Sequence, residues 1–177
     1  MSNVPKAEAD RAAASAQLGR PLRGPVAVGH RCACGLPDVI VTPPRLPEGT
    51  PFPTTFYLTC PRATAALSTL ESEGVMVQMA SDLAEDQVLR AAYQVAHEDY
   101  LRRRAEVAAE FGVDPVPEIE GVSAGGMPTR VKCLHSLAGH ALAAGPGVNP
   151  LGDRALAMIA ERGLWACATV CVSEEAE

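Results

Sequence analysis

Five prolines fall between Pro43 and Pro53, and this segment constrains the fold more than any other stretch of the chain. Proline lacks a backbone N–H and has a fixed φ, so the segment can enter neither a helix interior nor a central strand. We therefore predict an extended loop here. A second segment rich in glycine and proline, residues 112–128, predicts another loop further along the chain.

Strand patterns flank the first loop. Residues 26–34 place apolar, histidine and cysteine side chains two apart, which is the period of a strand. Residues 38–42 predict a short buried strand, and residues 54–60 predict a third from their β-branched and aromatic content. If the first strand is regular, one face carries His30, Cys32 and Cys34.

Helical spacing dominates the rest of the chain. We predict helices over residues 62–73, 83–111, 129–143 and 153–162, with Ser81 as a cap before the long second helix. On that helix Tyr93 and Tyr100 share an apolar face, and the run from Arg102 to Arg104 is interpreted as a solvated face. Residues 165–172 are apolar and predict a last strand or a packed tail.

The order of these elements predicts the fold class and the domain organisation. Early strands followed by helices predict an α+β domain, in which a small antiparallel sheet of about three strands packs against several helices, one of them long. The length of 177 residues suits one domain. We expect a flexible tail or a short Ala-rich helix over residues 1–20, a single domain over 21–172, and an acidic tail over 173–177.

Charge and hydrophobicity exclude several classes of partner. The net charge of -6 makes nucleic acid an unfavourable partner, because phosphate neutralisation dominates that kind of binding. The sequence contains no run of 18 apolar residues, so it predicts no membrane-spanning helix. Residues 1–17 lack the apolar core of a secretory signal. We therefore expect a cytoplasmic protein with reduced cysteines.

Cysteine and histidine concentrate in three places, and thiolate and imidazole are the preferred ligands of zinc. On a regular helix Cys133 and His140 would lie about 10.5 Å apart along the axis, with His135 about 160° around from Cys133. The helix alone therefore cannot supply three ligands, and a zinc site would need thiolates from the strand region as well. The candidate ligands are Cys32, Cys34, Cys60, Cys133, His135 and His140.

Two other interpretations of these residues stay open. Cysteine is among the most buried residue types, so all of the thiols can be inert core residues. Alternatively, Cys133 or Cys60 is a nucleophile with His135 or His140 as its base.

The glycine-rich segment before the predicted helix suggests an anion site. Exposed amides at a helix N-terminus near Thr129, approached past Gly125 and Gly126, would favour a phosphate or another small anion. Arg130 and Lys132 would supply positive charge beside them. The alternative is a flexible loop with two ordinary surface cations.

Several short motifs together resemble a known family. They are HRCACGLP (30–37), RLPEGTPFP (45–53), YLTCP (57–61), SAGGMP (123–128), RVKCLH (130–135) and NPLGD (149–153). The chain resembles, over about residues 20 to 160, the bacterial domain-of-unknown-function family numbered 501, common in actinobacteria. The resemblance implies no catalytic residue. It implies a gene neighbourhood shared with a septum-formation initiator and an exopolyphosphatase-like protein.

Two functional hypotheses follow. The first is a small cytosolic protein with one Cys/His-lined site at the junction of sheet and helices, binding zinc or a small anionic ligand. The second is a non-enzymatic interaction module, linked to cell division through its gene neighbourhood. It would dock a protein partner through the Tyr93/Tyr100 helix or the proline-rich loop.

Overall fold

The three predicted strands form one antiparallel sheet. The structure is a computed structural model that describes residues 4–166 and 169–171. Its strands are β1 (Ala27–Arg31), β2 (Pro37–Val41) and β3 (Phe56–Leu58), paired in the order β1-β2-β3. Helices occupy most of the remaining chain, so the predicted α+β class is confirmed.

The first strand ends earlier than its sequence pattern predicts. After Arg31 the chain turns, and the turn contains Cys32 and Cys34. The Gly35 amide donates to the Cys32 carbonyl at 2.9 Å, and Gly35 has a φ of 89°, a conformation that favours glycine. The prediction that His30, Cys32 and Cys34 share one strand face is therefore wrong, because a turn interrupts the two-residue period.

The described residues form six α-helices and one short 3-10 helix, η1. They are α1 (Val4–Leu18), α2 (Pro61–Ser72), α3 (Val75–Glu85), α4 (Gln87–Glu110), η1 (Pro117–Ile119), α5 (Leu134–Ala144) and α6 (Pro150–Glu161). None of the helices in the described ranges combines the length and hydrophobicity needed to span a membrane.

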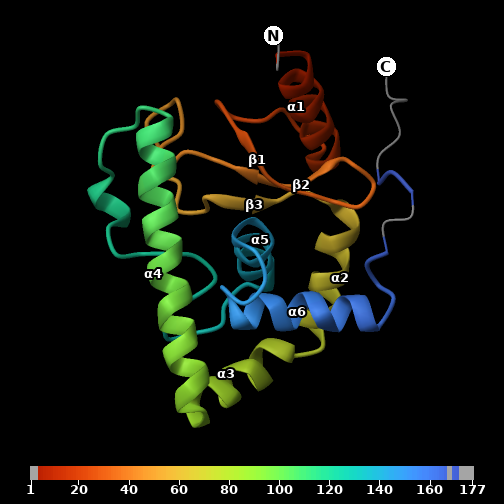
Figure 1. The fold of residues 1–177 in the computed structure, drawn as a ribbon, viewed down its shortest axis with the longest axis vertical. Coiled ribbons are helices and arrows are strands. Elements are labelled where there is room, and N and C mark those ends of the chain that lie inside the picture. The colour runs from red at the N-terminus through yellow and green to blue at the C-terminus, as the bar shows by residue number, and fades with distance from the viewer. Residues whose placement is uncertain (1–3, 167–168, 172–177) are drawn as a thin grey trace.

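The sheet lies between α1 on one face and α5 on the other (Figure 1). Neighbouring residues of β2 show this division, since Ile40 packs with Ala14 of α1 and Val39 packs into the main core. Asp10 of α1 also accepts two hydrogen bonds from Arg31, at 2.7 and 2.6 Å. Of the two expectations for the N-terminal residues, a flexible tail or a short helix, the structure has the helix over residues 4–18. This helix packs on the sheet.

The predicted long helix over residues 83–111 is two helices. Asp86 separates α3 from α4 in an extended conformation, and its carboxylate accepts hydrogen bonds from the amides of Val88 and Leu89 at 2.8 and 3.0 Å. Asp86, rather than Ser81, is therefore the cap of the long helix. Short polar side chains at this position satisfy amides that a continuous helix would bond internally.

The face of α4 that carries Tyr93 and Tyr100 belongs to the core. Both tyrosines are fully buried, and the Tyr100 hydroxyl accepts from the Thr55 amide at 2.7 Å. Arg104 is also buried, and it donates to the Ile119 carbonyl at 2.8 Å. The expectations of a docking face at the tyrosines and of a solvated Arg104 are corrected, because the tyrosines lie in the core and Arg104 is bonded to the segment that contains Ile119.

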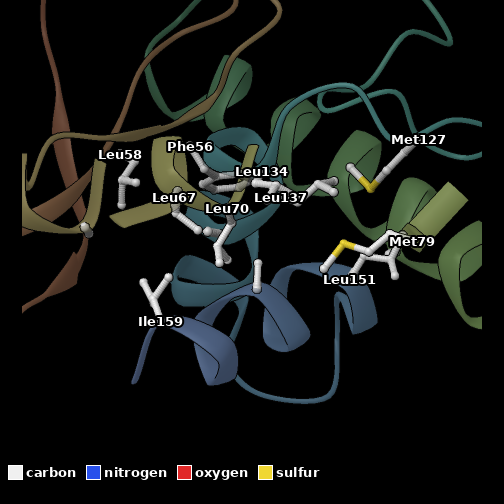
Figure 2. Close-up of a cluster of buried hydrophobic side chains, with 14 of the residues drawn as sticks. Phe56, Leu58, Leu67, Leu70, Met79, Met127, Leu134, Leu137, Leu151 and Ile159 are labelled. Atoms are coloured by element: carbon white, nitrogen blue, oxygen red, sulfur yellow. The ribbon is translucent and has the colours of Figure 1, made fainter. Parts of the chain in front are cut away.

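The core fills the space between β3, α2, α5 and α6 (Figure 2). Leucine and alanine make up most of it, with few aromatic side chains. Helix α5 approaches its neighbours closely: a Cβ on Gly139 would meet the Phe56 carbonyl oxygen at 2.7 Å. On α6, which begins after its cap Asn149 and not at Asp153 as predicted, a Cβ on Gly152 would lie 2.3 Å from a carbonyl of α5.

The chain after α6 forms no strand within residues 162–166 and 169–171. Trp165 and Cys171 instead pack against the core, which is the predicted packed tail. Val172 and the predicted acidic tail lie outside the described residues.

Candidate functional site

Helix α5 begins at Leu134, five residues later than predicted. Cys133 is its N-cap, with φ −156° and ψ 110°, so its backbone is extended rather than helical. The Cys133 side chain makes no capping hydrogen bond. The Leu134 amide instead donates to the Glu71 carboxylate of α2 at 2.7 Å, so a residue from another helix caps α5.

This late start brings three donor groups of different chemistry together. His135 Nδ1 lies 3.2 Å from the Glu71 carboxylate and 3.8 Å from the Cys133 sulfur. One donor atom from each residue lies within 4.8 Å of the other two. Within residues 4–166 and 169–171, this is the only group of three or more His, Cys, Asp or Glu side chains that is so arranged.

The other nitrogen of the His135 ring points to a different set of atoms. Nε2 lies 3.1 Å from the Thr64 carbonyl oxygen and 3.2 Å from the Ser68 hydroxyl. A carbonyl can only accept, so Nε2 carries a proton and Nδ1 is the nitrogen that faces sulfur and carboxylate. The ring is thereby held in the orientation that a metal-bound histidine requires.

Electrostatics favour charge on both members of the Cys133–His135 pair. The hydrogen bond with Cys133 raises the pKa of His135 to about 9, against the opposing effect of burial. Burial acts to raise the pKa of the Cys133 thiol, but hydrogen bonds from His135 and Ser136 outweigh it and leave that pKa below its ordinary value. A thiolate is the form of cysteine that binds metals or attacks electrophiles.

The site opens on a surface groove of about 510 Å³. Cys133, His135 and Ser136 form one wall, and residues from α1, β3 and the start of α2 form the rest. Two buried groove atoms, Gln17 Oε1 and Thr59 Oγ1, have no hydrogen-bond partner in the described structure. A small polar ligand in the groove would therefore meet an ionic group at one wall.

His140 does not join this group. Its ring is fully buried, with Nε2 3.0 Å from the Asp99 carboxylate and Nδ1 3.2 Å from the Asn149 side-chain nitrogen. It also stacks on Phe56 at a centroid distance of 5.4 Å. Burial lowers the pKa of His140, although Asp99 opposes the shift. Both ring nitrogens are occupied, so the described contacts give His140 a structural role.

Cys32, Cys34 and Cys60 do not converge on Cys133 in a compact donor group. Burial raises the pKa of the Cys60 thiol, which lies within electrostatic range of Cys32 and of a residue that the sequence did not single out, Cys171. The predicted single site therefore divides, with Cys133 apart from the other three thiols.

The glycines of the predicted anion site have a structural explanation. The carbonyls of Gly125 and Gly126 accept hydrogen bonds from the amides of Lys132 and Arg130, each at 2.8 Å. A Cβ on Gly126 would lie 2.6 Å from the Arg130 carbonyl oxygen. The helix start at Thr129 is wrong, so the helix N-terminus cannot support an anion here. Arg130 and Lys132 are exposed, and an anion site at them stays a prediction.

Glu71 and Cys171 were missed by the sequence analysis. Glu71 looks like an ordinary helical glutamate, and no local signal connects it with α5. Cys171 had one usable signal, because it is a cysteine in an apolar segment near the end of a chain with other unassigned thiols.

Comparison with known proteins gives a family and no activity. A family model described as "Protein of unknown function (DUF501)" matches residues 28–157. No curated protein and no solved structure matches the chain.

Proposed function

The chain belongs to the DUF501 family, whose model covers more than half of its 177 residues, and because that family is described only as of unknown function we propose a function from the site itself. The protein is a zinc-binding protein that holds the ion through Glu71, Cys133 and His135. It presents the ion to a small ligand in the adjoining groove.

The observation that carries this proposal is the convergence of sulfur and carboxylate on the same ring nitrogen, His135 Nδ1. In a nucleophile–histidine–acid triad, the nucleophile and the acid engage opposite nitrogens of the imidazole. Here the Thr64 carbonyl occupies the opposite nitrogen. Three donors that face one point suit a shared ion better than they suit a proton relay.

The chemistry of the donors selects zinc. Magnesium and calcium prefer oxygen ligands, and a thiolate is foreign to both. Zinc accepts sulfur, nitrogen and oxygen together in tetrahedral coordination. Its binding would displace the Nδ1 proton of His135 and hold Cys133 as thiolate, which couples zinc affinity to pH.

Three protein ligands leave one position for a water molecule or a ligand, as in catalytic zinc sites. A small anion, such as a carboxylate or a phosphate, is the ligand that we propose for this position, because a bound cation attracts it. Since the thiolate must stay reduced, the cytoplasm is the compartment that we propose.

Zinc titration of the chelator-treated protein tests the proposal. We expect Cys133→Ser to lose about one zinc ion per chain relative to the wild type, with unchanged circular dichroism. Zinc should also slow alkylation of Cys133 by iodoacetamide. If Cys133→Ser binds as much zinc as the wild type, or if Cys133 is alkylated equally fast with and without zinc, the proposal is wrong. Rapid zinc-independent alkylation would instead favour a nucleophilic cysteine.

A further inference from the structure

Four cysteines from three distant parts of the chain meet at one end of the sheet, away from the group described above. Cys32 and Cys34 lie in the turn between β1 and β2, and Cys60 is the N-cap of α2. Cys171 comes from the segment after α6 and packs against the core cluster that contains Cys60.

The segment that carries Cys171 is anchored by two side chains. Arg62, in the first turn of α2, donates to the Thr169 carbonyl at 3.0 Å and to the Val170 carbonyl at 3.3 Å. Gln17 of α1 donates to the Cys171 sulfur at 3.3 Å and to the Pro37 carbonyl at 2.8 Å. These contacts place Cys171 between the end of the β1–β2 turn and the start of α2.

The thiols lie near one another at this place. The Cys34 side chain hydrogen-bonds with the side chains of Cys32 and Cys171, and Cys60 lies within electrostatic range of the same two residues. Cys34, Cys60 and Cys171 are thiols and form no disulfide in the described structure.

Backbone amides also point at the sulfurs. Cys34 accepts hydrogen bonds from the amides of Leu36 and Cys171, and Cys60 accepts from the amides of Arg62 and Ala63 at the start of α2. Such donors stabilise a thiolate, although at Cys60 the opposing effect of burial is larger. In metal centres, hydrogen bonds to the ligands hold and tune the first coordination shell.

We propose that Cys32, Cys34, Cys60 and Cys171 form a second metal site, a tetrathiolate that binds zinc. Four thiolates in a tetrahedron are a standard structural zinc site. The ligand sulfurs of one zinc ion lie roughly 4 Å apart. No three of these four sulfurs lie within 4.8 Å of one another, the spacing found at Glu71, Cys133 and His135, so zinc binding draws the sulfurs together.

The contraction is feasible because the segment with Cys171 is held by side chains and not by a helix or a strand. Zinc binding would therefore fix this segment against the sheet. Gln17, which touches Cys171, also lines the groove beside Cys133 and His135. The second site would thus hold the segment with Cys171 against the sheet at the edge of the groove. It does not depend on the zinc site proposed in the groove.

Zinc content and cobalt spectra of the full-length protein test this inference. We expect about two zinc ions per chain in the wild type, and about one in both the Cys34→Ser/Cys171→Ser variant and the Cys133→Ser variant. With cobalt in place of zinc, the double variant should lose most of the thiolate-to-cobalt charge-transfer absorption, because it loses a four-sulfur site. The matched Cys133→Ser variant should lose only a small part, since it removes one sulfur ligand.

A measurement on the wild type covers the case in which the double variant does not fold. Cys34, Cys60 and Cys171 should be alkylated slowly when zinc is bound and at least about tenfold faster after chelation, as mapped by mass spectrometry. Equal rates would overturn the inference, as would a double variant that retains its zinc and its cobalt spectrum. Iron and sulfide in the purified protein, or a native disulfide among these cysteines, would also overturn it. Loss of zinc from Cys133→Ser alone concerns only the first site.

Discussion

The sulfur of Cys133 lies 3.8 Å from Nδ1 of His135, although the two residues are separated by only one position. On a continuous helix their side chains would point in nearly opposite directions. They meet because Cys133 is extended and His135 stands in the first turn of α5. The position of one helix boundary therefore creates the thiolate–imidazole pair on which the proposed zinc site depends.

Replacing Glu71 with glutamine tests whether this carboxylate is a ligand. The Glu71→Gln variant keeps an oxygen that can cap the Leu134 amide and removes only the negative charge. We expect zinc affinity at the site to fall by more than about 100-fold, which is more than the loss of a residue that only supports a ligand usually causes. Competition with a chromophoric chelator measures this affinity.

The matched control is Glu73→Gln. Glu73 lies near the same end of α2 but pairs with Arg162 on the surface, so its replacement should leave zinc affinity unchanged. Equal effects of the two variants would remove Glu71 from the ligand set.

Alanine at Gly139 or Gly152 should destabilise the protein. In an ordinary helix interior this change is stabilising by about 1 kcal/mol. Here the added Cβ would approach a carbonyl oxygen of a neighbouring element at 2.7 or 2.3 Å, so we expect a loss of about 1–3 kcal/mol. Urea denaturation measures the free energy of unfolding, and exposed Ser81→Ala on α3 serves as the control. A gain in stability at both glycines would contradict the close packing of α5.

Arg104 should contribute more to stability than its neighbour Arg102. Arg104 is buried and donates to the carbonyls of Ile119 and Val122, which the replacement Arg104→Met would leave without these donors. We expect a loss of about 2–4 kcal/mol in urea denaturation. Arg102 is exposed, and Asp99 keeps its ion pair with Arg103, so Arg102→Met should cost less than about 1 kcal/mol. Similar losses for the two variants would refute the anchoring role of Arg104.

Buried His140 should make the protein less stable as the pH falls below the ordinary histidine value of 6.5. Its pKa is lower in the folded state, chiefly through burial, so the unfolded chain binds the proton more readily. The contribution of His140 is fully present above pH 6.5 and is lost as the pH falls toward the folded-state pKa.

The test of this prediction compares the wild type with His140→Gln at about pH 7.5 and about pH 5.5. The wild type should lose more stability between the two pH values than the variant does, because only the wild type can protonate this residue on unfolding. The comparison cancels the titration of other groups, including His97. Parallel losses in the two proteins would show that His140 does not titrate as proposed.

The elements that depend on local pattern were predictable. The strands at β2 and β3 follow from short runs of β-branched and aromatic residues, and α2 follows from a proline at its first position. The failures occurred where a helix cap or a turn interrupts a pattern. Asp86 ends α3 and caps α4 although the apolar spacing continues across it. Cys32 and Cys34 keep a two-residue spacing although a turn has replaced the strand.

For the candidate sites, the sequence alone determined which residue types have the right chemistry: Cys133, His135 and the thiols of the turn were identified from it. The tertiary structure decided which of them meet. Glu71 reaches Leu134 and His135 because α2 packs beside α5, and Cys171 reaches Cys34 because the chain after α6 returns to the sheet. The physical reason is that hydrophobic periodicity acts over a few residues, whereas donors far apart in sequence converge only through the packing of a shared core.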